Sequence, residues 1–155
     1  MRRRRQRGLT LIELIVAFTI MLILTAMAVP LARNKVRAER ERDLRYALRE
    51  VRQAIDKFKD NCDMGYLGPQ KLGANCYPET LEQLVEGVKL PGPAGKKMRF
   101  LRRIPRDPFT GKADWGLRSD QDDPTSTSWG GQDVFDIYTK TTQKAPDGTS
   151  YSEQW

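Results

Sequence analysis

The residues of this sequence that could carry chemistry are carboxylates and two cysteines, because the 155-residue chain contains no histidine. Without histidine, the most common general base, the serine–histidine triads and histidine-ligated metal centres are excluded. The sequence also holds no phosphate-binding loop and no recognisable pairing of a nucleophile with a base. We therefore expect a protein that is not an enzyme, and we ask what its unusually placed carboxylates do.

Glu13 is the most unusually placed carboxylate, because it is the one charged residue in the apolar segment 9–32, which we call the stem. A helix of this length would extend about 36 Å, which is enough to cross the hydrocarbon core of a bilayer. A carboxylate near the centre of such a helix costs a few kcal/mol, so residues of this kind are usually paired or functional. Glu13 therefore needs a partner of opposite charge.

A basic leader, residues 1–8, precedes the stem and contains five of the 27 basic residues of the chain. These five are Arg2, Arg3, Arg4, Arg5 and Arg7. Cationic residues before an apolar segment favour the cytoplasmic side, so we expect the N-terminus in the cytoplasm and the rest of the chain outside. If the chain is cut after Gly8, 22 basic residues remain against 20 acidic ones. The charge that could have indicated nucleic-acid binding then largely disappears, and no nucleic-acid partner is expected.

Cleavage after Gly8 would also give Glu13 a partner. The new N-terminus would be the amine of Leu9, and Glu13 would be the fifth residue of the mature chain. At this spacing the amine and the carboxylate can pair within one chain or between neighbouring chains. Two other interpretations stay open, namely a plain signal anchor and a secretory signal peptide cut at the A-x-A-like pattern of Ala26 and Ala28.

The segment 7–13, RGLTLIE, resembles the processing motif of type IV prepilins and of type II secretion pseudopilins. The family usually has phenylalanine where this chain has Leu9, and it commonly carries a proline at the place of Pro30. The resemblance implies that an inner-membrane prepilin peptidase recognises Gly8 and that Leu9 becomes N-methylated. It also implies that Glu13 accepts the N-terminal charge of a neighbouring subunit, and that Pro30 marks a stretch that can lose helical structure in the filament.

The rest of the sequence predicts an α+β fold, in which a long N-terminal helix packs on a small antiparallel sheet domain of the pilin-like kind. Residues 33–60 continue the helix as an amphipathic segment, and residues 61–155 form the globular domain. The apolar stripe of the helix consists of Val36, Leu44, Leu48, Val51, Ile55 and Phe58. In the domain we expect a short helix capped by Thr80, a loop over 90–98 and strands at 115–118 and 134–139.

The two cysteines, Cys62 and Cys76, have thirteen residues between them, which is too wide for a C-x-x-C redox or zinc motif. In an exported protein the simplest interpretation is one disulfide that closes a loop. Two unpaired thiols are the alternative.

Two further segments are similar to the major pseudopilins of type II secretion. Residues 77–84, YPETLEQL, and residues 100–109, FLRRIPRDPF, match the family's patterns around its short helix and its I-P-x-D-P segment. On physical grounds alone, Pro105 and Pro108 fix an extended chain and Phe109 offers an aromatic anchor. A loop that only packs on the sheet would explain these residues equally well.

The resemblance also raises a calcium hypothesis, because major pseudopilins hold one structural calcium in their C-terminal loops. The candidate ligands are Asp147, Asp133 and Asp136, since calcium takes carboxylate and carbonyl oxygens. This chain departs from the family, because residues 149–153, TSYSE, replace the usual acidic run, and no EF-hand spacing is present. The alternative is a loop without metal, held by Trp129 and by turn hydrogen bonds.

The sequence therefore predicts a structural subunit of a type II secretion pseudopilus, anchored in the inner membrane by a single pass before it joins a periplasmic filament. The expected partners are other copies of the chain, the prepilin peptidase, minor pseudopilins, the inner-membrane assembly platform and membrane lipid. The main competing hypothesis is a type IVa pilin of a surface pilus, although such pilins usually place their cysteine pair near the C-terminus. A DNA-uptake subunit and a plain membrane-anchored periplasmic protein are two further hypotheses.

Overall fold

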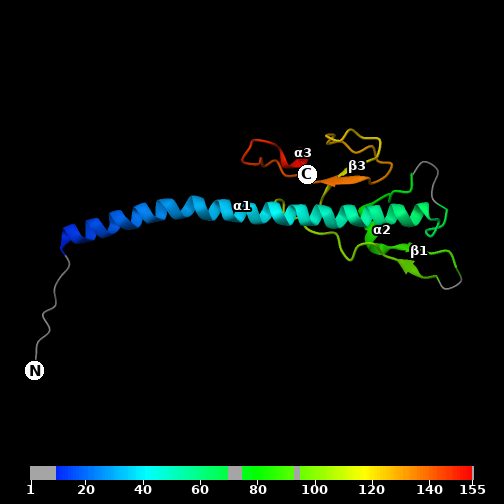
Figure 1. Ribbon diagram of the computed structural model, residues 1–155, viewed down its shortest axis with the longest axis horizontal. Coiled ribbons are helices and arrows are strands. Elements are labelled where there is room, and N and C mark those ends of the chain that lie inside the picture. Colours follow the sequence, from blue (N-terminus) through cyan, green and yellow to red (C-terminus); the bar gives the residue numbers. More distant parts are fainter. Residues whose placement is uncertain (1–9, 70–74, 93–94, 155) are drawn as a thin grey trace, which may run out of the picture. The chain divides into compact units, whose positions relative to one another are not determined.

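The computed structural model describes residues 10–69, 75–92 and 95–154 (Figure 1). Its elements are α1 (Leu11–Asp63), α2 (Leu81–Glu86), β1 (Val88–Lys89), β2 (Lys97–Met98), β3 (Gly116–Arg118), β4 (Asp136–Tyr138) and α3 (Tyr151–Gln154). The chain divides into two units between Glu39 and Arg40, and α1 contributes to both of them. The long helix and the small antiparallel domain confirm the predicted α+β fold.

The first unit is the N-terminal part of α1, and its helix begins at a capping residue. The hydroxyl oxygen of Thr10 accepts a hydrogen bond from the backbone N–H of Glu13 at 3.4 Å. A threonine followed three residues later by glutamate is a typical start signal for a helix, because it satisfies an N–H group that has no partner in the first turn. Farther along, the hydroxyls of Thr19 and Thr25 donate to the carbonyls of Ile15 and Met21 at 2.8 Å. The stem therefore satisfies these hydroxyl donors within its own helix.

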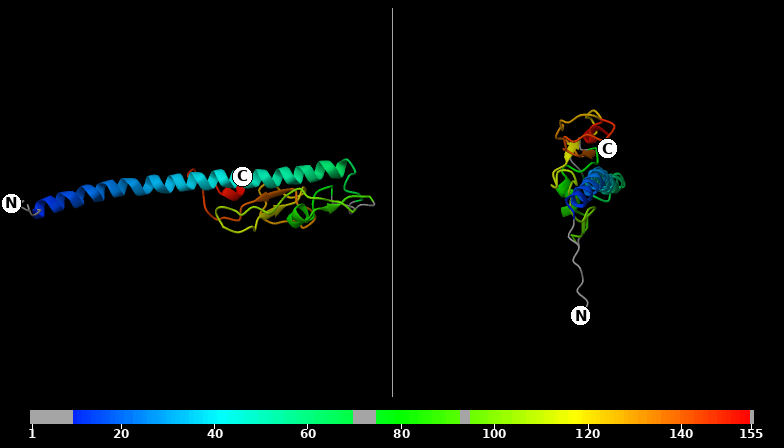
Figure 2. Two further views of the ribbon diagram at one scale, coloured as in Figure 1. Left: turned by 90° about the horizontal axis from the view of Figure 1, so that it is seen from below. Right: turned by 90° about the vertical axis from the view of Figure 1, so that its left-hand side faces the viewer.

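The second unit has its core along one face of α1. The five core residues from the predicted apolar stripe are at most 2% exposed; they are Leu44, Leu48, Val51, Ile55 and Phe58. They belong to one buried cluster with Leu84 of α2, Ile137 of β4 and Tyr151 of α3. Figure 2 shows these elements along one side of this part of the helix. Val36 has the spacing of the same stripe, but it belongs to the first unit and is 49% exposed.

The C-terminal end of α1 is tied to the following loop by a disulfide. The helix ends at Asp63, three residues beyond the predicted boundary, so that Cys62 lies in its last turn. Cys62 and Cys76 are bonded, with their Cα atoms 5.5 Å apart and a sequence separation of 14. Four residues before Cys62 in α1, the ring of Phe58 meets the ring of Phe100 edge to face, with centroids 5.2 Å apart. Helix and domain are therefore joined here both covalently and by packing.

Replacing both Cys62 and Cys76 by serine is expected to lower the free energy of unfolding by about 2–3 kcal/mol, because an open chain gains loop entropy on unfolding. Thermal unfolding of the purified full chain in detergent measures this loss. Wild-type protein under a reducing agent serves as the matched control and should show the same loss. Equal stability of the variant and the oxidised wild type would contradict the prediction.

The strands form two separate antiparallel ribbons instead of one continuous sheet. Val88 of β1 pairs with Met98 of β2, and Gly116 of β3 pairs with Tyr138 of β4. The predicted loop over 90–98 thus contains a short strand. After β2 the chain turns toward α2, where the N–H groups of Phe100 and Leu101 both donate to the carbonyl of Leu84 at 3.0 Å. These two N–H groups bond to a carbonyl of α2 and are therefore not available for pairing with a strand. For this reason β2 does not continue toward β3.

The start and end of α2 follow the sequence signals. Thr80 caps the helix by accepting from the N–H of Gln83 at 3.4 Å, and the side chain of Gln83 accepts from the N–H of Glu79 at 2.8 Å. Gly87 ends the helix with φ at +79°, and a Cβ at this position would overlap the carbonyl of Met98. Glycine is therefore needed where α2 passes into the first ribbon.

Candidate functional site: the stem and the C-terminal loops

Glu13 lies in the first turn of α1, surrounded in sequence by exposed apolar side chains. Leu11 is 78% exposed, Ile12 is 71% exposed and Leu14 is 46% exposed. The first turn of a helix carries a partial positive charge, which favours a carboxylate at this position. Gly8 and Leu9 lie outside the described residues, so their place beside Glu13 stays a prediction.

The described part of the stem presents apolar side chains that are not covered by any other residue that the structure describes. All of residues 10–32 are exposed, and α1 is long and apolar enough here to cross a membrane. Burying one Leu, Ile, Val, Phe or Met side chain contributes roughly 1.5–3 kcal/mol. A surface of this kind requires lipid or other helices around it.

Pro30 lies inside α1, and the helix continues on both sides of it. Because proline has no N–H, it cannot donate to the carbonyl of Ala26, and this turn has one hydrogen bond fewer than its neighbours. A missing hydrogen bond weakens the helix locally, and the loss of helical structure here in a filament stays a prediction.

The three predicted calcium ligands do not share a site. The carboxylate of Asp147 accepts from the N–H of Thr149 at 3.0 Å and from its hydroxyl at 2.6 Å. Asp136 forms an ion pair with Arg52 of α1 at 2.6 Å. Asp133 is 1% exposed and accepts from the N–H of Asp120 at 3.2 Å. Burial raises the pKa of Asp133, which reflects the cost of keeping its charge away from water.

Within residues 10–69, 75–92 and 95–154, no three acidic, cysteine or histidine side chains come together as a metal-binding group. The residues present therefore do not fit a calcium site built from Asp133, Asp136 and Asp147. Calcium binding stays a prediction that the geometry of these carboxylates does not support.

Residues 119–133 form hydrogen bonds within their own loop. One oxygen of Asp122 accepts from the N–H of Ser119 at 2.8 Å and from the N–H of Gly130 at 3.1 Å. These two bonds stabilise the charged form and lower the pKa of Asp122. The indole N–H of Trp129 donates to the carbonyl of Asp133 at 2.7 Å. The loop is thus closed at both ends by its own side chains.

Asp107 is a buried carboxylate that is not among the predicted site residues. It is fully buried, accepts from the hydroxyl of Thr139 at 2.6 Å and accepts from the N–H of Phe109 at 2.8 Å. It thereby fixes the I-P-R-D-P-F segment to the end of β4. A signal for this role exists in the sequence, since an aspartate between two prolines is well placed to hydrogen-bond the backbone that follows it.

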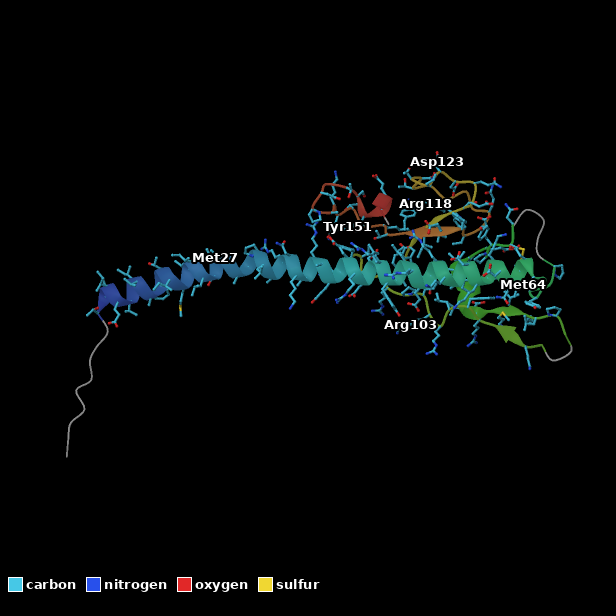
Figure 3. The ribbon with its side chains drawn as sticks, viewed as in Figure 1. Met27, Met64, Arg103, Arg118, Asp123 and Tyr151 are labelled. Atoms are coloured by element: carbon cyan, nitrogen blue, oxygen red, sulfur yellow. A yellow bond between two sulfur atoms is a disulfide. The ribbon has the colours of Figure 1, made fainter. Side chains whose placement is uncertain are left out.

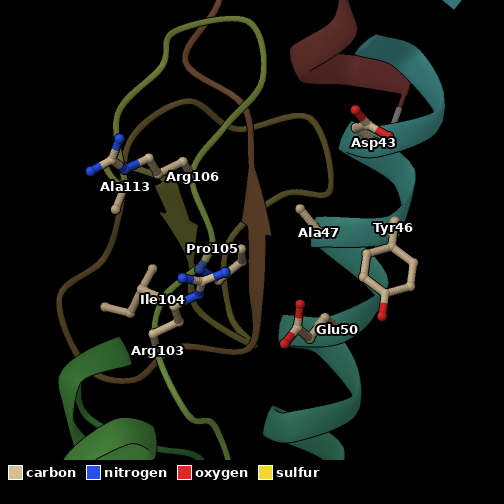
Figure 4. A pocket seen from close by; sticks show the side chains of 9 residues that line it. All are labelled: Asp43, Tyr46, Ala47, Glu50, Arg103, Ile104, Pro105, Arg106 and Ala113. Atoms are coloured by element: carbon tan, nitrogen blue, oxygen red, sulfur yellow. The ribbon is translucent and has the colours of Figure 1, made fainter. Parts of the chain in front are cut away.

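A groove of about 680 Å³ runs between α1 and this segment (Figure 4). Asp43, Tyr46 and Glu50 line its helix wall, and Arg103 and Arg106 line the opposite wall. The groove thus combines carboxylates and guanidinium groups with one phenol, and its lining includes no cysteine, serine, threonine or lysine nucleophile. Its chemistry suits charge pairing with a partner and offers no nucleophile–base pair for covalent catalysis.

Comparison with known proteins agrees with these features. The family described as the prokaryotic N-terminal methylation motif matches residues 3–29, which include Gly8 and Glu13. The chain is 32% identical over 117 residues to a type II secretion system core protein G of Klebsiella michiganensis, covering 72% of this chain and 73% of that protein. It is also 32% identical over 111 residues to the protein of the same name from Escherichia coli strain K12, covering 68% of each. No solved structure matches significantly. The chain therefore belongs to the family of the type II secretion system core protein G, the major pseudopilins.

Proposed function

We propose that this chain is the major structural subunit of a type II secretion pseudopilus, made as a precursor, cut after Gly8 and polymerised through its stem. The observation that carries this proposal is the combination of the RGLTLIE motif with an apolar helix whose described residues are all exposed, in a member of the core protein G family. The surface-pilus hypothesis is not better supported by any of these findings.

Before assembly the stem spans the inner membrane, with the arginine-rich leader in the cytoplasm and the domain in the periplasm. Prepilin peptidase removes the leader, and the amine of Leu9 then pairs with Glu13 of a neighbouring subunit. Packing of apolar stems supplies most of the cohesion, while the charge pair sets their register. The inner-membrane platform and a cytoplasmic ATPase add subunits at the filament base, and minor pseudopilins complete the filament.

In this proposal the subunit has a structural role in the filament and does not catalyse a reaction. The relatives are named core proteins of a type II secretion system, and the residues that line the groove include no nucleophile–base pair. Once the leader is removed, its charge is close to balance, so binding of nucleic acid is not part of the proposed role.

Replacing Gly8 by glutamate is expected to leave the leader uncleaved and to abolish filaments in cells that carry the peptidase and the secretion machinery. Intact-mass analysis of the membrane-extracted protein checks cleavage, and electron microscopy of sheared filaments together with an export assay checks assembly. Leu9→Phe is the matched control, since it installs the residue usual in the family and should be cut and assembled.

The mass measurement, together with the filament and export assays and a test of surface motility, distinguishes the competing interpretations. A mature chain that begins just after Ala28 would identify a secretory signal peptide. An uncut wild-type chain would identify a plain membrane anchor. Wild-type filaments that support surface motility but no export would favour the type IVa pilus.

A further inference from the structure

Arg118 is a buried cation of the C-terminal domain. The proposed assembly through the stem does not use this side chain. Arg118 is the last residue of β3 and is 5% exposed. Burying a guanidinium costs free energy unless nearly all of its N–H groups have acceptors. The acceptors of Arg118 therefore indicate which segments it stabilises.

The acceptors of Arg118 come from three separate segments. Its Nε donates to the carbonyl of Ser126 in the 119–133 loop at 2.8 Å, and its Nη2 donates to the carbonyl of Ser152 in α3 at 2.9 Å. Its Nη1 lies 3.8 Å from a carboxylate oxygen of Asp136 in β4. One side chain therefore joins a loop, a strand and the C-terminal helix, and Figure 3 shows Arg118 on the same side of α1 as Asp123 of the loop and Tyr151 of α3.

An aromatic ring completes the environment of this guanidinium. The central carbon of Arg118 lies 4.4 Å from the centre of the Tyr138 ring, which is a favourable cation–π distance. The hydroxyl of Tyr138 donates to the carbonyl of Thr127 at 2.7 Å, so the ring is itself held by the loop that Arg118 binds.

These partners are of the kind that a calcium ion would use. Calcium is bound by backbone carbonyls and carboxylates, and Arg118 binds two carbonyls and one carboxylate. The carboxylates expected for calcium already have partners within the chain. Asp136 faces both Arg52 and Arg118, Asp147 accepts from Thr149, and Asp133 accepts from the N–H of Asp120. The positive charge that these segments share is therefore that of the Arg118 side chain.

We propose that the guanidinium of Arg118 takes the place of a structural metal ion in this domain, so that closure of the 119–133 loop and docking of α3 are independent of calcium. The proposal concerns the folded domain and stands independently of the proposed function. A planar guanidinium directs its donors along fixed lines, whereas an ammonium group is a point charge on a flexible stem. Lysine at position 118 should therefore fail to hold the loop carbonyl and the helix carbonyl at once.

The first test measures thermal unfolding of the full chain in detergent, after dialysis against a chelator and again with millimolar calcium chloride. The expected result is the same melting temperature in both buffers. A lower melting temperature after chelation, or one bound calcium per chain by elemental analysis of the untreated protein, would overturn the proposal.

The second test compares Arg118→Lys with the exposed control Arg103→Lys by amide hydrogen exchange. In Arg118→Lys, exchange should be at least about tenfold faster in peptides from both the 119–133 loop and α3, because the loss of one group frees both segments. The control should exchange like the wild type. Unchanged protection of either segment in Arg118→Lys would contradict the proposal, and if that variant does not fold, the chelation result alone decides.

Discussion

Glu13→Gln is expected to reduce filament yield by more than about tenfold while leaving membrane insertion and leader cleavage intact. Glutamine keeps the shape and the hydrogen-bonding oxygen of the side chain but removes the charge that would bind a neighbour's amine. In an apolar filament core the unpaired amine would be costly to bury, and a loss of only ~1.4 kcal/mol per added subunit already weakens its binding tenfold. Removing a charge from the stem makes insertion into lipid easier, so assembly and insertion should respond in opposite directions.

The measurement is the amount of subunit in sheared filaments relative to the amount of cleaved subunit in the membrane. Thr19→Val is the matched control, because it is a polar-to-apolar change of similar shape in the same exposed helix. Its hydroxyl bonds to its own helix and should not be needed by a neighbour. Wild-type filament yield from Glu13→Gln would contradict the proposed pairing of this carboxylate with a neighbour's amine.

Gly116→Ala is expected to destabilise the domain by about 1–3 kcal/mol or more, the usual range for overpacking a filled interior. Gly116 pairs directly with Tyr138 across the second ribbon, and a Cβ at this position would overlap the tyrosine ring. The ring cannot move freely, because its hydroxyl bonds to Thr127 and its face lies against Arg118. A single methyl group should therefore disturb the loop as well as the ribbon.

Chemical unfolding of the full chain in detergent measures this loss, and a double-mutant cycle tests its cause. In a Tyr138→Ala background the same Gly116→Ala change should cost much less, because the overlapping ring is gone. An equal cost in both backgrounds would place the strain in the backbone of β3 and contradict the steric explanation.

Much of the fold could be predicted because its signals are local. The apolar spacing of Leu44, Leu48 and Val51 on α1 needs only the helical period, and Thr80 identifies the start of α2 through the residue three positions later. Glu13 could be recognised in the same way, because a single charge within an apolar segment is unusual whatever the surrounding structure.

The interactions that hold the domain closed could not be predicted, because they join residues that are distant in the sequence. The helical period places Arg52 on a solvated face of the helix, yet it binds Asp136, which lies 84 residues later. Asp136 is in turn a plausible calcium ligand by residue type, since nothing in the sequence indicates which cation will approach a carboxylate. Arg118 resembles an ordinary charged end of a strand until the positions of Ser126 and Ser152 are known.

The capped start of α1 bears on how the stem can leave the bilayer. Because Thr10 caps the helix, the amine of Leu9 would stand one residue before the cap, and the Glu13 carboxylate lies within the first turn. In the proposed precursor, the five arginine side chains of the leader would hold this end at the cytoplasmic surface. After the proposed cleavage this end would be a zwitterion without net charge, which loses less hydration in apolar surroundings than separate cations do. Removing eight residues would thus change a fixed anchor into an electroneutral stem that can be withdrawn from lipid.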